Sequence, residues 1–152
     1  MPESSKSKSL IQDRTEGHLG FTGSRSALSK SRYRKLKKFL KKMKKKGFHT
    51  LHHGDAVGSD HKAHLAAADL GYRVVIHPPE NPKYRAYSEK YGSEGGVEVL
   101  PKGEYMKRNR DIVNTSSIMI AMPIEKHQEE LRSGTWACIR YARKVSKKIV
   151  FI

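Results

Sequence analysis

The chain is poor in the residues that build disulfide frameworks, cysteine-ligated metal centres and membrane spans. Cys138 is the only cysteine among 152 residues, so no internal disulfide and no multi-cysteine zinc site can form. A single thiol is typical of a reducing compartment. No apolar run is long enough to cross a bilayer, and residues 1–9 lack the apolar core of a secretory signal. We therefore expect a cytoplasmic location and no membrane partner.

The first residues also lack the apolar periodicity of a folded element. Residues 1–17 are mostly polar and charged, and we expect them to form a disordered polar and basic tail. The remaining residues, 18–152, are enough for one domain with a sizeable core.

Acidic residues are scarce, with 15 Asp and Glu against 31 Lys and Arg, and the formal net charge is +16. The imbalance is local, because residues 30–46 hold eleven of these cations and no acid. Tyr33, Leu36, Leu40 and Met43 recur there at helical spacing, which predicts a helix with one apolar face. Two interpretations of its other face remain open. It is a solvated surface, or it contacts the phosphates of nucleic acid through Lys35, Lys38, Lys41, Lys42 and Lys45.

The rest of the chain alternates short apolar strands with helical patterns. Strands are expected at 18–22, 48–52, 73–77, 117–122 and 148–152, with a further short one at 97–100. Helices are expected at 30–46, 59–71, 105–114 and 135–145, with Ser59 or Asp60 as an N-cap. This order predicts a single Rossmann-like α/β domain: a mostly parallel sheet of about five strands with helices on both faces.

Three glycine-bearing turns follow strands in this scheme. They are Gly23-Ser24-Arg25, residues 54–60, and Ser133-Gly134-Thr135 just before the last helix. Ligands of open parallel sheets bind beyond the carboxyl ends of the strands, and helix N-termini attract phosphate through unpaired N–H groups. The three turns together predict a pocket for a nucleotide or a nucleotide derivative.

Each residue of this predicted site has a chemical role and a simpler alternative. Ser133, Gly134 and Thr135 would hold phosphate, or Ser133 is an ordinary N-cap. Gly23 would admit the ligand to the backbone while Ser24 and Arg25 donate hydrogen bonds. The remaining candidates are Gly54 and Gly58 for the turn, Asp55 for ribose or a base edge, Arg108 for phosphate and Asn109 for sugar or base.

Two further groups of residues have less specific patterns. His52, His53, His61 and His64 are close in sequence but show no metal-ligand spacing, so no metal or other cofactor is expected. The long segment 78–103 has the length of a functional loop. Its tyrosines, Tyr84, Tyr87 and Tyr91, could stack on a base or simply pack.

The ordered set of motifs resembles the SLOG superfamily of Rossmann-like proteins. The motifs are Gly23-Ser24-Arg25, residues 53–60, residues 108–113 and Arg132-Ser133-Gly134-Thr135, and the resemblance covers residues 18–152. This superfamily includes the cytokinin-activating phosphoribohydrolases and DNA processing protein A. The resemblance implies a nucleotide pocket and makes a homo-oligomer plausible.

One departure from the phosphoribohydrolases bears on catalysis. Their Gly-Gly-x-Gly-Thr-x-x-Glu motif ends in a catalytic glutamate, whose place is taken here by Cys138, while Leu131 and Arg132 replace the leading glycines. We therefore expect a nucleotide sensor or sequestering module. The alternatives are a nucleotide N-glycosidase that uses another acid, Asp55 or Glu104, and a nucleic-acid-binding accessory protein.

Overall fold

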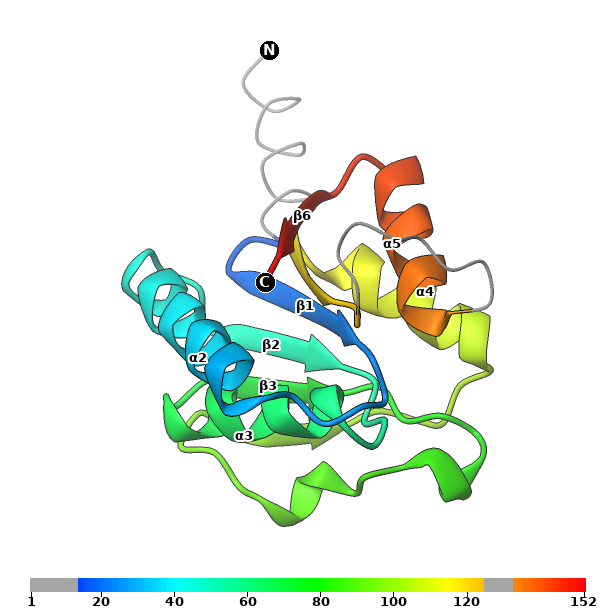
Figure 1. Ribbon diagram of the computed structural model, residues 1–152, viewed down its shortest axis with the longest axis horizontal. Helices are drawn as coiled ribbons and strands as arrows, with labels where there is room; N and C mark the ends of the chain where they lie inside the picture. Colours follow the sequence, from blue (N-terminus) through cyan, green and yellow to red (C-terminus); the bar gives the residue numbers. More distant parts are fainter. Residues whose placement is uncertain (1–13, 125–132) are drawn as a thin grey trace.

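In the computed structural model, six parallel strands form one sheet covered by helices on both faces (Figure 1). The structure describes residues 14–124 and 133–152. The strand order is β4-β3-β2-β1-β5-β6. The strands are β1 (His18–Gly23), β2 (Thr50–His53), β3 (Arg73–Ile76), β4 (Val97–Val99), β5 (Ile118–Met122) and β6 (Lys148–Phe151). This confirms the predicted Rossmann-like class, with β4 as a sixth strand where about five were expected.

Two helix pairs cover the two faces of the sheet (Figure 1). In the described part of the chain the helices are α2 (Lys30–Lys45), α3 (Ser59–Asp69), α4 (Tyr105–Thr115) and α5 (Gly134–Lys144). α2 and α3 pack together on one face, and α4 and α5 on the other. Two short 3₁₀ turns, η1 (Pro82–Tyr84) and η2 (Ser88–Lys90), lie in the β3–β4 connection. No helix in the described residues is long and apolar enough to cross a bilayer.

The predicted pattern of α2 explains its position. The Ser29 side chain caps the helix by accepting a hydrogen bond from Arg32 N, and Leu36, Leu40 and Met43 are buried against the sheet. Each such side chain contributes ~1.5–3 kcal/mol of hydrophobic stabilisation. The helix ends at Lys45 with Lys46 as its C-cap, and the following Gly47 has a φ of 101°, which suits glycine.

The N-cap of α3 differs from the prediction. Gly58 occupies the cap position without a side-chain hydrogen bond, so neither Ser59 nor Asp60 is the cap. Gly58 has a φ of 97°, and a Cβ there would overlap the Arg25 carbonyl oxygen. The turn therefore needs glycine because two backbone segments meet at this point.

The chain begins its ordered contacts before β1. Gly17 accepts hydrogen bonds through its carbonyl from His49 N (2.9 Å) and Thr50 N (3.2 Å). Gly17, the last residue of the expected tail, therefore packs against the start of β2. Residues 1–13 of the expected tail, and Leu131 and Arg132 of the last motif, lie outside the described residues.

The direction of strand addition reverses beside β1. Strands β2, β3 and β4 add on one side of β1, whereas β5 and β6 add on the other. Gly23 at the end of β1 is in register with Met122 at the end of β5. This is the switch point at which ligands of such sheets bind.

Candidate functional site

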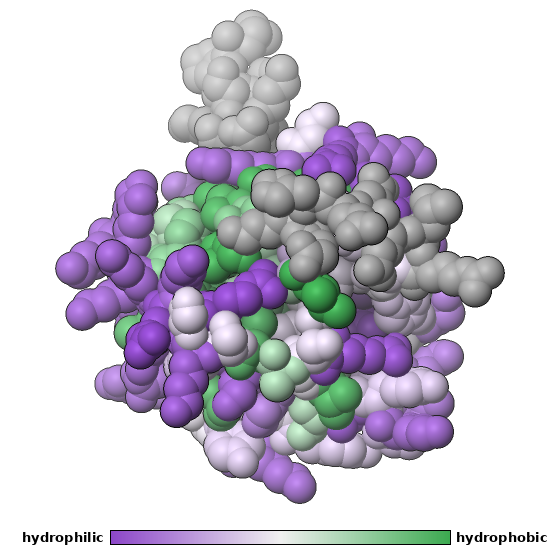
Figure 2. All heavy atoms as spheres, viewed as in Figure 1, coloured by the Kyte–Doolittle hydropathy of each residue, from purple (hydrophilic) through white to green (hydrophobic). Residues whose placement is uncertain are grey.

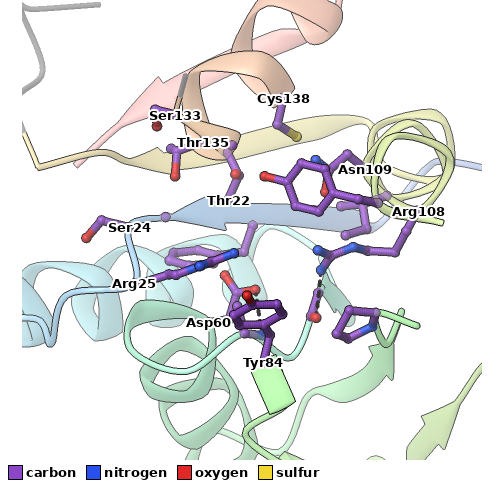
Figure 3. A pocket seen from close by; sticks show the side chains of 18 of the residues that line it. Thr22, Ser24, Arg25, Asp60, Tyr84, Arg108, Asn109, Ser133, Thr135 and Cys138 are labelled. Atoms are coloured by element: carbon purple, nitrogen blue, oxygen red, sulfur yellow. Dashed lines mark hydrogen bonds between the residues drawn. The ribbon is translucent and has the colours of Figure 1, made fainter. Parts of the chain in front are cut away.

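A cavity of about 670 Å³ opens at the carboxyl edge of the sheet, beside the switch point (Figure 3). This volume lies within the range of about 300–1,000 Å³ that small-molecule sites occupy. Most of the predicted ligand residues line this cavity; they are Gly23, Ser24, Arg25, Gly54, Arg108, Asn109, Ser133, Gly134 and Thr135. Asp55 and Gly58 do not. The geometry brings the motifs together, and their contact with a ligand stays a prediction.

The N-terminus of α5 forms one wall of the cavity. Ser133 is the N-cap, and its side chain accepts from Trp136 N at 3.3 Å. The helix itself offers no acceptor to the amides of Gly134 and Thr135, and the helix dipole adds positive potential. Both interpretations of Ser133 are compatible, because a capping hydroxyl leaves these two amides available to an anion.

Tyr105 of α4 reaches across to this helix terminus. A Cβ on Gly134 would overlap the Tyr105 hydroxyl. The Tyr105 hydroxyl thus lies against the backbone of Gly134, at the N-terminus of α5.

The β1–α2 turn forms the second wall. Its backbone is fixed by hydrogen bonds from Ser24 N to Met122 O and from Ser59 N to Ser24 O, both 3.2 Å. A Cβ on Gly23 would overlap the Ser59 hydroxyl. The Arg25 guanidinium lies over the Tyr84 ring, with its carbon 4.6 Å from the ring centroid. Arg25 therefore bridges to the long loop at the cavity wall.

Arg108 forms the third wall and is 7% exposed. Its Nη1 donates to the Gly54 carbonyl at 2.7 Å, and a Cβ on Gly54 would overlap that nitrogen. Its Nε is buried and has no hydrogen-bond partner in the described part of the chain. A buried donor without an acceptor costs about 1–3 kcal/mol, which is a cost that a bound acceptor would remove.

Asp60 is a carboxylic acid in the cavity wall that the sequence patterns assigned to helix capping. It is 6% exposed and accepts from Ala56 N at 3.1 Å. Burial raises its pKa to about 6, although the nearby Arg108 charge acts in the opposite direction. Figure 3 places Asp60 beside Tyr84, across the cavity from Ser133 and Thr135. The cavity thus has the N-terminus of α5 on one side, and Asp60 together with Arg108, both next to Gly54, on the other.

Asp55 and Glu104, the acids considered for catalysis, are engaged elsewhere. Asp55 is fully buried and its carboxylate accepts from Arg85 Nε, Tyr87 N and Ser88 N. Glu104 caps α4 by accepting from the amides of the first helical turn. Neither side chain lines the cavity. Asp55 anchors the long loop, and Glu104 stabilises a helix end.

Cys138 lines the cavity from α5 but is 2% exposed. Burial raises the pKa of its thiol to about 12. It is therefore a protonated thiol near neutral pH and unsuited to nucleophilic attack.

The histidines form hydrogen-bonded rows. His53 Nε2 lies 2.9 Å from His64 Nδ1, and His64 Nε2 lies 2.7 Å from the Tyr91 carbonyl oxygen. A second row links His18, His52 and His77. No cluster suited to a metal ion occurs within residues 14–124 and 133–152.

Further cavity residues lie outside the predicted ligand set. Thr22, Glu80, Asn81, Tyr84 and Tyr105 all line the cavity. Tyr84 was an expected stacking candidate, whereas Tyr87 and Tyr91 lie outside the lining. The approach of Tyr105 to Gly134 depends on how α4 and α5 pack, which no local pattern reports.

No protein-family model matches the chain, and no curated protein matches its sequence significantly. Solved structures do match its fold. DNA processing protein A from Streptococcus pneumoniae superposes with a TM-score of 0.65 at 20% identity, over 88% of this chain and 49% of that chain. The present chain thus spans about half the length of that protein.

Two further structures give similar agreement. The molybdenum cofactor binding protein from Rippkaea orientalis has a TM-score of 0.65 at 18% identity, over 88% of this chain and 74% of that chain. DNA processing protein A from Helicobacter pylori, which binds single-stranded DNA, has a TM-score of 0.64 at 16% identity, over 93% of this chain and 67% of that one. At these identities the likeness concerns the fold, which is the Rossmann-like α/β fold that the sequence patterns predicted.

Proposed function

We propose that this SLOG-fold protein binds a nucleotide or a nucleotide derivative in the cavity, as a sensor or a sequestering module. The observation that carries the proposal is the convergence of two anion-seeking features. One is the N-terminus of α5 at Gly134 and Thr135, and the other is the buried Arg108, whose Nε has no acceptor in the described part of the chain. Such a pair favours a ligand with a phosphate or another anionic group.

The part of the cavity wall formed by Asp60 and Tyr84 suits the uncharged part of such a ligand. Asp60 offers a carboxyl group to sugar hydroxyls or base N–H groups, and Tyr84 offers a ring for stacking. The relative from R. orientalis binds the molybdenum cofactor, which supports a small-molecule role for the same fold.

Replacing Arg25 by alanine should weaken nucleotide binding about tenfold, because a charge-assisted hydrogen bond contributes roughly 1.5–3 kcal/mol. Isothermal titration with a panel of nucleoside 5′-monophosphates measures this, and inorganic phosphate alone serves as the reference. Arg110→Ala is the matched control, since Arg110 is exposed on α4 and lies outside the cavity lining. Absence of nucleotide binding by the unaltered protein would refute the proposal.

Measured relative to the Asp60→Asn variant, affinity for these nucleotides should also fall several-fold as the pH rises from about 5.5 to 7.5. Asp60, with a pKa of about 6, is neutral at the lower pH, and its charged form repels an anionic ligand. The Asp60→Asn variant should lack this component. The ligand's own phosphate titrates near pH 6 with both proteins. The ratio of the two affinities at each pH therefore isolates the contribution of Asp60. An identical pH profile in both proteins would argue against Asp60 facing the ligand.

Asp60 also gives the hydrolase alternative a concrete form. A carboxyl group with a pKa near neutrality is suited to general acid–base work, and Asp55 and Glu104 are engaged outside the cavity. Release of free base from a nucleoside monophosphate, abolished in Asp60→Asn, would establish this alternative. Intact nucleotide after incubation supports the sensor role.

Nucleic-acid binding is a second candidate function, favoured by the charge of α2. That helix carries its cations along its length and has no acid in its first turn, and the H. pylori relative binds single-stranded DNA. Retention of the protein on any nucleic acid at low salt, with loss at high salt, is the basic test.

A further inference from the structure

We propose that the outer face of α2 binds the sugar–phosphate backbone of double-stranded DNA without reading its sequence. This inference rests on the second candidate function and specifies its surface and its partner. The surface is defined by Arg34, Lys38, Lys41 and Lys45, called the basic stripe below. All four are exposed.

The stripe follows from the geometry of the helix. Leu36, Leu40 and Met43 face the core, and at 100° per residue the four stripe cations point the opposite way. Spacings of four and three residues align them over about 16 Å of helix axis, given a rise of 1.5 Å per residue. Figure 2 shows hydrophilic side chains gathered over α2, at the left of the molecule.

The protein's own acids do not neutralise this stripe. The cations of α2 that contact the rest of the fold are Lys37, which pairs with Asp69, Lys44, which donates to Leu70 O, and Arg32, which donates to Ile152 O. Within the described ranges the stripe cations have no ion pair with an acidic side chain. Like charges four residues apart destabilise a helix, and phosphates would remove that repulsion.

The chemistry of the face selects duplex DNA among polyanions. Single strands are held by aromatic side chains on which bases stack, but Tyr33 and Phe39 of α2 pack on the core. A lipid surface is held by an amphipathic helix whose apolar face enters the bilayer, and here that face is buried in the protein. The major groove of B-DNA is wide enough for a helix to lie between the two phosphate backbones, where the long stripe side chains can reach phosphates, whereas the major groove of duplex RNA is too narrow.

Fluorescence anisotropy with a labelled DNA duplex of about 20 base pairs tests the inference, alongside its single strands, the matching RNA duplex and vesicles of anionic lipid. Four phosphate contacts predict a plot of log K against log salt with a slope of about −3 to −4. The double variant Lys38→Glu/Lys41→Glu should weaken duplex binding at least tenfold in low salt and flatten that slope. The control Lys144→Glu/Lys148→Glu makes the same charge change at exposed positions of α5 and β6.

Loss of binding in the double variant would not reflect unfolding. Its glutamates would face Arg34, Lys37, Lys42 and Lys45 at spacings of four residues, so helix stability should be unchanged or higher. Tighter binding of single strands, RNA or vesicles, or equal losses in both double variants, would overturn the assignment to the stripe. Failure of the unaltered protein to bind any nucleic acid would instead refute the second candidate function itself.

Discussion

Replacing Asp55 by alanine should lower the free energy of unfolding by about 3–5 kcal/mol, the effect of breaking a buried ion pair from one side. Asp55 is fully buried, and Oδ2 accepts from Arg85 Nε at 2.8 Å. Tyr87 N and Ser88 N donate to the same carboxylate at 3.1 and 2.9 Å. Removing it leaves these donors without their acceptor, with the Arg85 side chain only 8% exposed.

The backbone adds to this effect. Asp55 has a φ of 56°, in the left-handed region that Asp and Asn tolerate and alanine does not. Asp55→Asn is therefore the matched control: it keeps the conformation and an acceptor oxygen while removing the charge. Its loss should be clearly smaller, because Arg85 also pairs with Glu89.

Urea unfolding followed by circular dichroism gives both free energies. The alanine variant should also bind nucleotide more weakly, because the loop that Asp55 holds carries Tyr84 into the cavity wall. Equal stability of Asp55→Ala and the unaltered protein would mean that Asp55 does not anchor this loop.

The sheet and part of the cavity could be predicted from local sequence patterns. The alternation of strand and helix patterns predicted the sheet, and the glycine turns predicted part of the cavity lining, because both depend on local periodicity and on strand ends. β1, α2 and the turn at Gly23 are examples.

The remainder depends on packing between distant segments. Asp55 accepts its hydrogen bonds from a loop some 30 residues further along the chain, in a segment without periodicity. Asp60 looked like a helix cap because Asp often caps helices. Gly58 takes that position instead, which places Asp60 in the cavity wall.

Acidification from pH 7 to 5 should strongly destabilise the protein. Burial lowers the pKa of His52 to about 3 and of His77 to about 4, and that of fully buried His53 falls well below 6.5. The unfolded chain binds protons at these histidines below about pH 6.5, whereas the folded chain does not. Stability is therefore complete above pH 6.5 and is lost as the pH falls toward 4.

Hydrogen bonding explains why protonation is not tolerated locally. His64 donates from Nε2 to the Tyr91 carbonyl, so its Nδ1 must accept from His53 Nε2, and His53 Nδ1 accepts from Asp55 N. An imidazolium has no acceptor nitrogen, so one proton breaks this row. In the row that joins His18, His52 and His77, with N···N distances of 2.8 and 2.9 Å, both ring nitrogens of His52 face other imidazoles, so burial is the main cost of protonating it.

The titration of Asp60 acts in the opposite direction and reduces the pH dependence of the free energy of unfolding. Asp60, with its pKa raised from 3.8 to about 6, binds a proton more readily in the folded state and gains stability as the pH falls through about 6. Three buried histidines contribute up to about 4 kcal/mol per pH unit and Asp60 offsets about 1.4, which leaves roughly 3 kcal/mol per unit at the steepest point.

Urea unfolding at intervals between pH 7.5 and 4.5 measures this slope directly. His77→Gln should reduce it by about one proton, or roughly 1.4 kcal/mol per pH unit. A free energy of unfolding that is constant from pH 7 to 5 would mean that these histidines are not held neutral by burial.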